Sequence, residues 1–475
     1  MQWNDLLCEK RKGTVGKTAK TTDTRNEFQK DYHRIICSAS FRRLQDKTQV
    51  FPLDSSDFIR TRLTHSIEVS SFAKSLGQSV CQYLMVHERD AEINAEIKEK
   101  ICSVLECAGL IHDIGNPPFG HFGESSIRNW FQNHLDKIEF NGKKATDLLD
   151  VHMQNDLYHF EGNAQALRLL SKLHYLVDEN GMHLTFALLN TLIKYPVSSC
   201  EINKTSNNIK DKKMGYYYAE KELFEEIYTS TGAVGCRHPL TYLLEAADDI
   251  AYKTADIEDA LKKGYLSYYD LLKELKSDMY IEQCQSEREC EKYQQVVGWL
   301  EEKYQRAHKA GIANPELNAV QNWVISVQGF LLNCATYGFT ANYQVIMEGC
   351  FTSDLLSHSF GKVLSNALSN IAYQYVFRSK QILKIEISAG NILNFLLDRF
   401  VNAVIYYDTN QKLSPLEDRL IHIISENYKQ IYNLYTQGKR EAEKLYLRLL
   451  LVTDFICGMT DSYAKSLYQE LNGIT

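Results

Sequence analysis

Three separated positions in the sequence carry side chains that suit a divalent metal ion. His112 and Asp113 are adjacent, while His65 lies upstream and Asp248 downstream. Imidazole nitrogen and carboxylate oxygen together suit cations such as Mn, Mg, Co, Fe and Zn. An isolated His-Asp pair is more often a hydrogen-bonded helix end or an ion pair. All four side chains together predict one octahedral site with two open positions, provided that the fold brings them together.

The His-Asp pair stands at the end of a helix predicted over 101–111, whose apolar residues require burial. Pro117 and Pro118 prevent this helix from continuing. Glycines on both sides of the prolines allow the chain to turn, and we expect a new helix to begin at Glu124. This loop returns a second imidazole, that of His121, and a carboxylate toward the first pair.

Two further helices must supply the remaining ligands. His65 lies on a strongly amphipathic helix, and Arg62 precedes it by about one turn on the same side. Asp248 lies on an apolar helix, and its face continues at Tyr252 and Asp256. A buried acid is costly unless it is paired or binds a metal, so Asp248 is the expected fourth ligand.

Composition predicts a large, mainly helical protein. The chain has 475 residues, only 7 prolines and a formal charge of −7, so nothing global indicates a nucleic-acid or membrane surface. It shows neither a signal peptide nor an apolar run long enough to span a membrane. The 12 cysteines are scattered without a CxxC pair, which favours reduced thiols. We therefore expect a cytoplasmic protein.

The chain is predicted to form one all-α unit with at most a short β element. We expect three parts, namely an arm and substrate-wall helix at 1–57, a catalytic core at 58–260, and additional helices at 261–475. Within them, the basic segment 9–25 is predicted to be an exposed arm, and the polar segment 198–213 a flexible insertion. Alternating residues at 382–387 favour a short strand.

Five sequence blocks resemble a known family. They are 28–51 (FQKD, FRRL and KTQVF), 112–124 (HDIGNPPFGHFGE), 160–165 (FEGNAQ), 245–252 (EAADDIAY) and 458–461 (GMTD). The chain is similar to the HD-superfamily metallophosphohydrolases and, more narrowly, resembles the deoxyguanosinetriphosphate triphosphohydrolase family. These blocks span nearly the whole chain. The resemblance implies an HD-domain helical fold.

The resemblance also implies a chemistry. His65, His112, Asp113 and Asp248 would hold one divalent ion, with Mn or Mg expected and Co, Fe, Ni or Zn possible. His121 and Glu124 would be the catalytic pair, in which Glu124 orients and charges His121. The implied reaction cleaves the bond between O5′ and the α-phosphorus of a deoxynucleoside triphosphate and releases a deoxynucleoside and tripolyphosphate. The metal would polarise the α-phosphate.

Substrate contacts follow from the same resemblance and from the charge of a triphosphate. The expected contacts are Arg62, Lys194 and Lys213 to phosphates and Gln49, Tyr252 and Asp256 to the sugar. Taken alone, each of the two lysines is more often a surface residue. The family name implies a preference for dGTP. Family members also form oligomers, often hexamers, and some respond to nucleotides or single-stranded DNA.

Two alternatives remain open. One is an HD phosphohydrolase that acts on another nucleotide, such as (p)ppGpp. The other is a non-catalytic nucleotide or DNA sensor that keeps the fold. The presence of both His121 and Glu124 favours an enzyme over a sensor.

Overall fold

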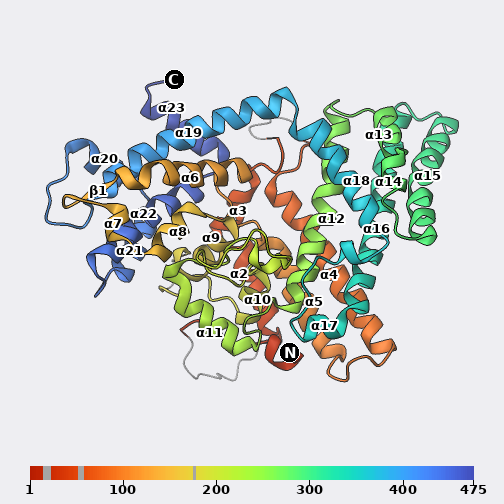
Figure 1. Ribbon diagram of the computed structural model, residues 1–475, viewed down its shortest axis with the longest axis horizontal. Coiled ribbons are helices and arrows are strands. Elements are labelled where there is room, and N and C mark those ends of the chain that lie inside the picture. Colours follow the sequence, from red (N-terminus) through yellow and green to blue (C-terminus); the bar gives the residue numbers. More distant parts are fainter. Residues whose placement is uncertain (14–22, 52–57, 175–177, 475) are drawn as a thin grey trace.

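The computed structural model describes residues 1–13, 23–51, 58–174 and 178–474. Almost all regular structure in these residues is helical, which confirms the all-α prediction (Figure 1). Within the described residues, the strands are β1 (Glu139–Phe140) and β2 (Lys143–Lys144), which form an antiparallel hairpin. None of the described helices has the length and apolar character that a membrane crossing requires.

Three long helices pack together at the centre of the molecule. They are α4 (Arg62–Val86), α5 (Ala95–Ile111) and α12 (Pro239–Lys262). Thr61 begins α4 with a capping box, and Asn94 caps α5 through its side-chain oxygen. Caps of this kind satisfy backbone N–H groups that have no partner at a helix start, so the sequence fixes where both helices begin.

The contact between α4 and α5 is unusually close at Gly109. A side chain at this position would collide with the backbone of Ser70. The absence of a side chain therefore lets the two helices approach each other closely near the end of α5, directly before His112 and Asp113.

The other helices surround this centre (Figure 1). The N-terminal elements are α1 (Trp3–Leu6), α2 (Glu27–Ile36), α3 (Ala39–Arg42) and η1 (Arg43–Asp46). The middle elements are α6 (Gly120–His134), η2 (Leu135–Lys137), α7 (Ala145–Leu148), α8 (Val151–Tyr158), α9 (Gly162–Arg168), η3 (Leu169–Leu173), α10 (Phe186–Leu192), η4 (Ile209–Asp211), η5 (Tyr218–Glu220) and α11 (Lys221–Thr231).

The C-terminal part adds two groups of helices. One group lies beside α12 and contains α13 (Tyr268–Leu275), α14 (Asp278–Ile281), α15 (Glu287–Lys309), α16 (Pro315–Ala341), α17 (Tyr343–Met347), η6 (Leu356–His358), α18 (Lys362–Ala372) and η7 (Tyr373–Phe377). The other contains α19 (Lys380–Val404), α20 (Pro415–Ile423), α21 (Glu426–Tyr435), α22 (Glu441–Cys457) and α23 (Asp461–Leu471). Helix α19 crosses the top of the molecule in Figure 1 and packs against α6, α22 and α23.

Two local predictions are wrong, one about the type of an element and one about the start of a helix. The strand expected at 382–387 is the first part of α19, because Ile382, Ala389 and Ile392 are buried at helical rather than alternating spacing. The helix after the proline-broken loop begins at Gly120 instead of Glu124. His121 and Glu124 therefore lie about one turn apart on the same helix.

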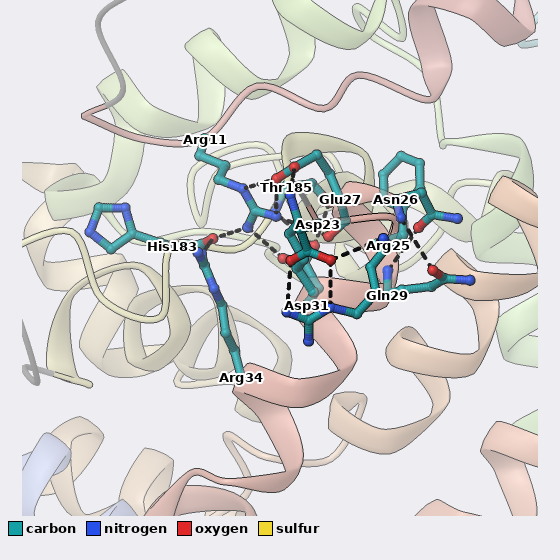
Figure 2. Close-up of polar contacts among 12 residues, drawn as sticks. Arg11, Asp23, Arg25, Asn26, Glu27, Gln29, Asp31, Arg34, His183 and Thr185 are labelled. Atoms are coloured by element: carbon teal, nitrogen blue, oxygen red, sulfur yellow. Dashed lines mark hydrogen bonds and ion pairs between the residues drawn. The ribbon is translucent and has the colours of Figure 1, made fainter. Parts of the chain in front are cut away.

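The segment 9–25 is mostly exposed over its described residues, as predicted, but Arg11 ties it to the body of the protein. Arg11 is buried, and its guanidinium bonds to Asp31 and Glu27 on α2 and to the carbonyl of His183 (Figure 2). Asp31 also accepts from the backbone and hydroxyl of Thr185. Residues 14–22 of this prediction, and the boundary expected at 57, lie outside the described residues.

The segment 198–213 is an ordered part of the structure, contrary to the prediction of a flexible insertion. Ser198 donates to Glu201, Ile209 donates its N–H to the carbonyl of Thr352, and Lys210 reaches the carbonyl of Gly235. Polar residues here make local and long-range hydrogen bonds, which composition alone does not reveal.

Candidate metal centre and catalytic dyad

The structure brings together the four side chains predicted to bind a metal. One ligand atom from each of His65, His112 and Asp113 lies within 4.8 Å of the others. Oδ1 of Asp248 lies 3.2 Å from Nε2 of His65 and 3.3 Å from Nε2 of His112. The side chains come from α4, the end of α5 and the middle of α12, which are the three helices of the central packing.

The chemistry of this cluster fits a divalent cation. Nδ1 of His112 donates to the carbonyl of Gly109 at 2.8 Å, so its Nε2 carries the lone pair in the neutral ring. This Nε2 atom faces carboxylate oxygens and, with Nδ1 of His65, is buried without a well-formed hydrogen bond to any described residue. A cation between the imidazoles and the carboxylates would satisfy Nε2 of His112, and it would meet His65 through Nε2, the nitrogen that faces Asp248.

Two buried cations stabilise the ionised carboxylates of the cluster. Burial acts to raise the pKa of Asp113, but Arg62, which forms an ion pair with it, and His112 together outweigh this effect and hold that pKa below its usual range. Burial also acts to raise the pKa of Asp248, but Lys194, at a distance of 3.1 Å, and the neighbouring histidines together lower that pKa. Both carboxyl groups are therefore ready to bind a metal at neutral pH.

His121 and Glu124 form a hydrogen-bonded dyad near the start of α6. Nδ1 of His121 lies 3.0 Å from Oε2 of Glu124, and Oε1 of Glu124 accepts the N–H of Gly162 at 2.8 Å. The His121 side chain is 81% exposed and that of Glu124 only 2%. The hydrogen bond to Glu124 raises the pKa of His121 above its ordinary value. A fixed carboxylate thus orients an accessible imidazole.

Glycines make the close approaches around the dyad possible. A side chain at Gly162 would collide with Asn116 and with the Glu124 carboxylate. Gly120 has φ of +57° and lies directly against the guanidinium of Arg62. Arg62 therefore contacts both the metal cluster, through Asp113, and the helix turn that carries His121.

Lys213 lies near the dyad, where its charge acts on His121 and Glu124. Its Nζ is 3.0 Å from Oε1 of Glu161, whose second oxygen lies 3.7 Å from Arg128. Burial, together with the nearby charge of Glu124, raises the pKa of Glu161. Arg62, Lys194 and Lys213, the predicted phosphate contacts, are thus all placed at the cluster or the dyad.

The three predicted sugar contacts make no hydrogen bond or ion pair with the cluster. Tyr252 follows Asp248 by one turn on α12, and burial together with Asp249 and Asp248 raises its pKa. Asp256 is buried, and burial raises its pKa to about 8. Oδ2 of Asp256 and Oε1 of Gln49 are both buried without a described hydrogen-bond partner.

Comparison with known proteins agrees with this geometry. The HD domain family matches residues 62–151, which carry three of the four cluster side chains and the whole dyad. A "Deoxyguanosinetriphosphate triphosphohydrolase-like protein" of Listeria monocytogenes is 48% identical over 479 residues, covering 100% of both chains. The chain belongs to the deoxyguanosinetriphosphate triphosphohydrolase family.

More distant members of this family also align along almost their whole length. A protein of Pseudomonas aeruginosa with the same "-like" name is 34% identical and covers 100% of this chain and 99% of its own. A "Deoxyguanosinetriphosphate triphosphohydrolase" of Yersinia enterocolitica is 32% identical, covering 94% of this chain and 93% of its own. The HD domain and these names indicate a phosphohydrolase.

Several residues that contact the cluster, the dyad or their neighbouring cations were not predicted from the sequence. Asn116 donates to Oδ1 of Asp113 at 2.8 Å, and Glu161 pairs with Lys213. Arg237 is buried and joins the carbonyl of Lys194 to Glu245. Asn116, Glu161 and Glu245 all lie within the sequence blocks that carry the resemblance, so their position in these blocks was an available signal.

Proposed function

We propose that this chain is a metal-dependent deoxynucleoside triphosphate triphosphohydrolase that favours dGTP. It would cleave the bond between O5′ and the α-phosphorus and release a deoxynucleoside and inorganic tripolyphosphate. The observation that carries the proposal is the placement of an oriented, accessible imidazole next to a buried His-Asp cluster, with Arg62 in contact with both. The names of the relatives supply the substrate class.

His65, His112, Asp113 and Asp248 would hold one divalent ion, with Mn or Mg as the expected metals and Co, Fe, Ni or Zn also compatible with these ligands. When bound, the ion would supply Lewis acidity toward the α-phosphate oxygens. The protein's own contribution is rigidity, because three packed helices fix the ligands. The Nδ1 bond of His112 to Gly109 also sets the orientation of that ring.

The dyad would act in proton transfer from the attacking water. Glu124 holds Nδ1 of His121, which leaves Nε2 free to act on the water or on the α-phosphate oxygens. Water oxygen forms a new bond to the α-phosphorus as the bond to O5′ breaks, and a proton ends on O5′ of the released deoxynucleoside. Glu124 stabilises the imidazolium that forms when His121 takes a proton.

The charges around the site match a polyanionic substrate. Arg62 and Lys194 already balance the carboxylates of Asp113 and Asp248. A divalent cation would therefore add net positive charge, which a triphosphate can neutralise. Lys213 adds a further cation next to the dyad, within reach of the phosphate chain, where its charge acts on both His121 and Glu124.

Sugar selection would depend on α12 and on Gln49. The oxygens of Gln49 and Asp256 are buried without a described partner. A deoxyribose hydroxyl can both donate and accept, so it would satisfy the Gln49 acceptor or the Asp256 carboxyl, whose pKa of about 8 keeps it mainly protonated at neutral pH. We assign Asp256 to the 3′ hydroxyl. The ring of Tyr252 would occupy the space that a 2′ hydroxyl needs, so a ribonucleotide would be excluded by crowding.

The proposal extends to assembly and effectors, which the family resemblance implies, and to location, which rests on the sequence. We expect a cytoplasmic homo-oligomer, with a hexamer as the expected state, and binding of a nucleotide or single-stranded DNA as an effector. Sedimentation velocity with and without each dNTP would measure the oligomeric state and its response to a nucleotide. A monomer at all concentrations would remove the assembly part of the proposal.

A product assay tests the proposed function. The four dNTPs and GTP would be incubated with the purified chain and Mn or Mg, and tripolyphosphate would be quantified by ion chromatography. We expect tripolyphosphate from dGTP and much less turnover of GTP. Release of pyrophosphate or orthophosphate would indicate another HD phosphohydrolase, such as one acting on (p)ppGpp. Binding without any turnover would indicate a nucleotide or DNA sensor.

A further inference from the structure

Three segments that are far apart in the sequence meet at the loop that directly precedes the helix of the dyad. We call this contact the C-terminal junction and define it by Lys47, Thr48, Asn116, Phe119, Cys457 and Asp461. It joins the segment before Gln49, the proline-broken loop, and the start of α23. None of these residues belongs to the metal cluster or the dyad.

One buried carboxylate occupies the centre of the junction. Asp461 is only 1% exposed, and its Oδ1 accepts the N–H of Phe119 at 2.9 Å. Its Oδ2 accepts both the N–H and the hydroxyl of Thr48, at 3.0 and 2.6 Å. Three donors from two separate segments thus converge on a single side chain, and hydrogen bonds to an ionised acceptor are the stronger kind.

The bond to Phe119 lies directly before the catalytic turn. Phe119 has φ of +63°, an uncommon conformation for a residue with a side chain, and it precedes α6 without a side-chain cap of its own. Such a conformation persists where the surroundings hold it. Asp461 fixes the Phe119 backbone, and His121 follows two residues later on the first turn of the helix.

The bond to Thr48 lies directly before the predicted sugar contact. Gln49 follows Thr48, and its side-chain oxygen is buried without a described partner. The two oxygens of Asp461 therefore connect the position of the proposed general base with the position of the proposed sugar contact.

Lys47 reinforces the same connection. Its buried ammonium donates at 2.6 Å to the carbonyl of Asn116 in the loop and at 2.6 Å to the carbonyl of Cys457 at the end of α22. The side chain of this Asn116 bonds to Asp113. The loop is thus held to the C-terminal helices at both its first and its last part.

We propose that Asp461 is a positioning residue for the dyad, which fixes the turn carrying His121 relative to the segment carrying Gln49. The effect on turnover rests on the proposed function. The C-terminal helices are then part of the catalytic machinery, because they set the distance between the reacting imidazole and the sugar pocket. A shift of about 1 Å in such a distance is enough to slow a reaction strongly.

The test uses two substitutions in the full-length chain and a neighbouring control. Asp461→Asn keeps one acceptor oxygen, and Asp461→Ala removes both. Ser462→Ala is the matched control, because Ser462 is the next residue and donates to Asp46 on η1 without contacting the loop. Each variant would be assayed for kcat and KM on dGTP and for bound metal by mass spectrometry.

We expect kcat to fall about tenfold in Asp461→Asn and further in Asp461→Ala, with bound metal unchanged and Ser462→Ala equal to the parent. Values of kcat within threefold of the parent in both Asp461 variants would overturn the proposal. A fall in kcat that parallels loss of metal would also overturn it, because Asp461 would then support folding in general.

A second readout does not depend on turnover. The pH dependence of diethyl pyrocarbonate modification of His121, followed by peptide mass spectrometry, reports the pKa of that imidazole. We expect its midpoint to fall by about half a pH unit in Asp461→Ala, because the bond to Glu124 loosens. An unchanged midpoint would contradict the positioning role. If the parent lacks triphosphohydrolase activity, the proposed function fails while this measurement still decides the role of Asp461.

Discussion

The protein contains two neighbouring histidine–carboxylate groups that differ in their surroundings. In the metal cluster, His65 and His112 are 0% and 4% exposed, and each imidazole faces Asp248. In the dyad, only the carboxylate is buried, while the His121 side chain is 81% exposed. The same residue types are therefore arranged for two tasks. Converging buried ligands suit an ion, and an oriented accessible imidazole suits exchange of a proton with a substrate or water.

Removing a cluster imidazole should have the largest effect. His112→Ala deletes a buried nitrogen that faces both carboxylates, so we expect loss of bound metal and a fall in turnover of about 1,000-fold or more. Metal content by mass spectrometry and tripolyphosphate release would be measured on the same samples. Full metal occupancy in this variant would show that the cluster is not the metal site.

Removing the dyad imidazole should lower turnover without affecting metal binding, and so distinguish the dyad from the metal cluster. His121→Ala should lower kcat by roughly 100- to 10,000-fold, since general acid–base catalysis contributes an effect of that size. Bound metal should stay at the parent level, because His121 is not part of the cluster. His183→Ala, which changes another partly exposed histidine paired with an acid, is a suitable control. Turnover equal to the parent in His121→Ala would remove the dyad from the reaction.

The charge of Glu124 should set the pH dependence. The hydrogen bond to Glu124 raises the pKa of His121, so the neutral imidazole that accepts a proton forms only as pH rises through this raised pKa. Glu124→Gln should therefore move the acidic limb of the kcat profile to lower pH and reduce the maximum about 10- to 100-fold. An unshifted limb would show that Glu124 does not tune His121.

Substitution of Lys194 or Lys213 should have the smallest effect on activity. The effect at the metal cluster should differ from the effect at the dyad. Lys194 contacts Asp248 in the cluster, and Lys213 contacts Glu161 next to the dyad. We expect Lys213→Ala to raise KM for dGTP about tenfold with bound metal unchanged, and Lys194→Ala to raise KM and also weaken metal binding. Lys221→Ala, at an exposed lysine, is the control. Identical effects of both lysine variants would contradict the division between cluster and dyad.

The sequence alone predicted the helical fold and the four side chains that now lie together, because residue type and helix spacing carry that information. It placed the start of the helix carrying His121 too late, since the left-handed backbone at Phe119 and the bond to Asp461 depend on a segment from the far end of the chain. It also predicted a strand at 382–387, where burial against neighbouring helices decides the periodicity. Long-range contacts of this kind are not visible in local patterns.

The contacts of Lys47 and Asp461 likewise could not be predicted from local sequence patterns. Asp461 lies in the GMTD block, to which the sequence assigned no role. Its hydrogen bonds reach Thr48 and Phe119, which are remote in the chain. The division of the chain at 57 and 260 stays a prediction, although the cluster itself is built across 62–151 and α12.

Hydrolysis of dGTP in ¹⁸O-labelled water, with Mn present and products analysed by mass spectrometry, tests the central claim most directly. Attack by water at the α-phosphorus predicts one ¹⁸O atom in tripolyphosphate and none in deoxyguanosine. Label in the deoxynucleoside, or the appearance of pyrophosphate or orthophosphate as the first product, would contradict the account.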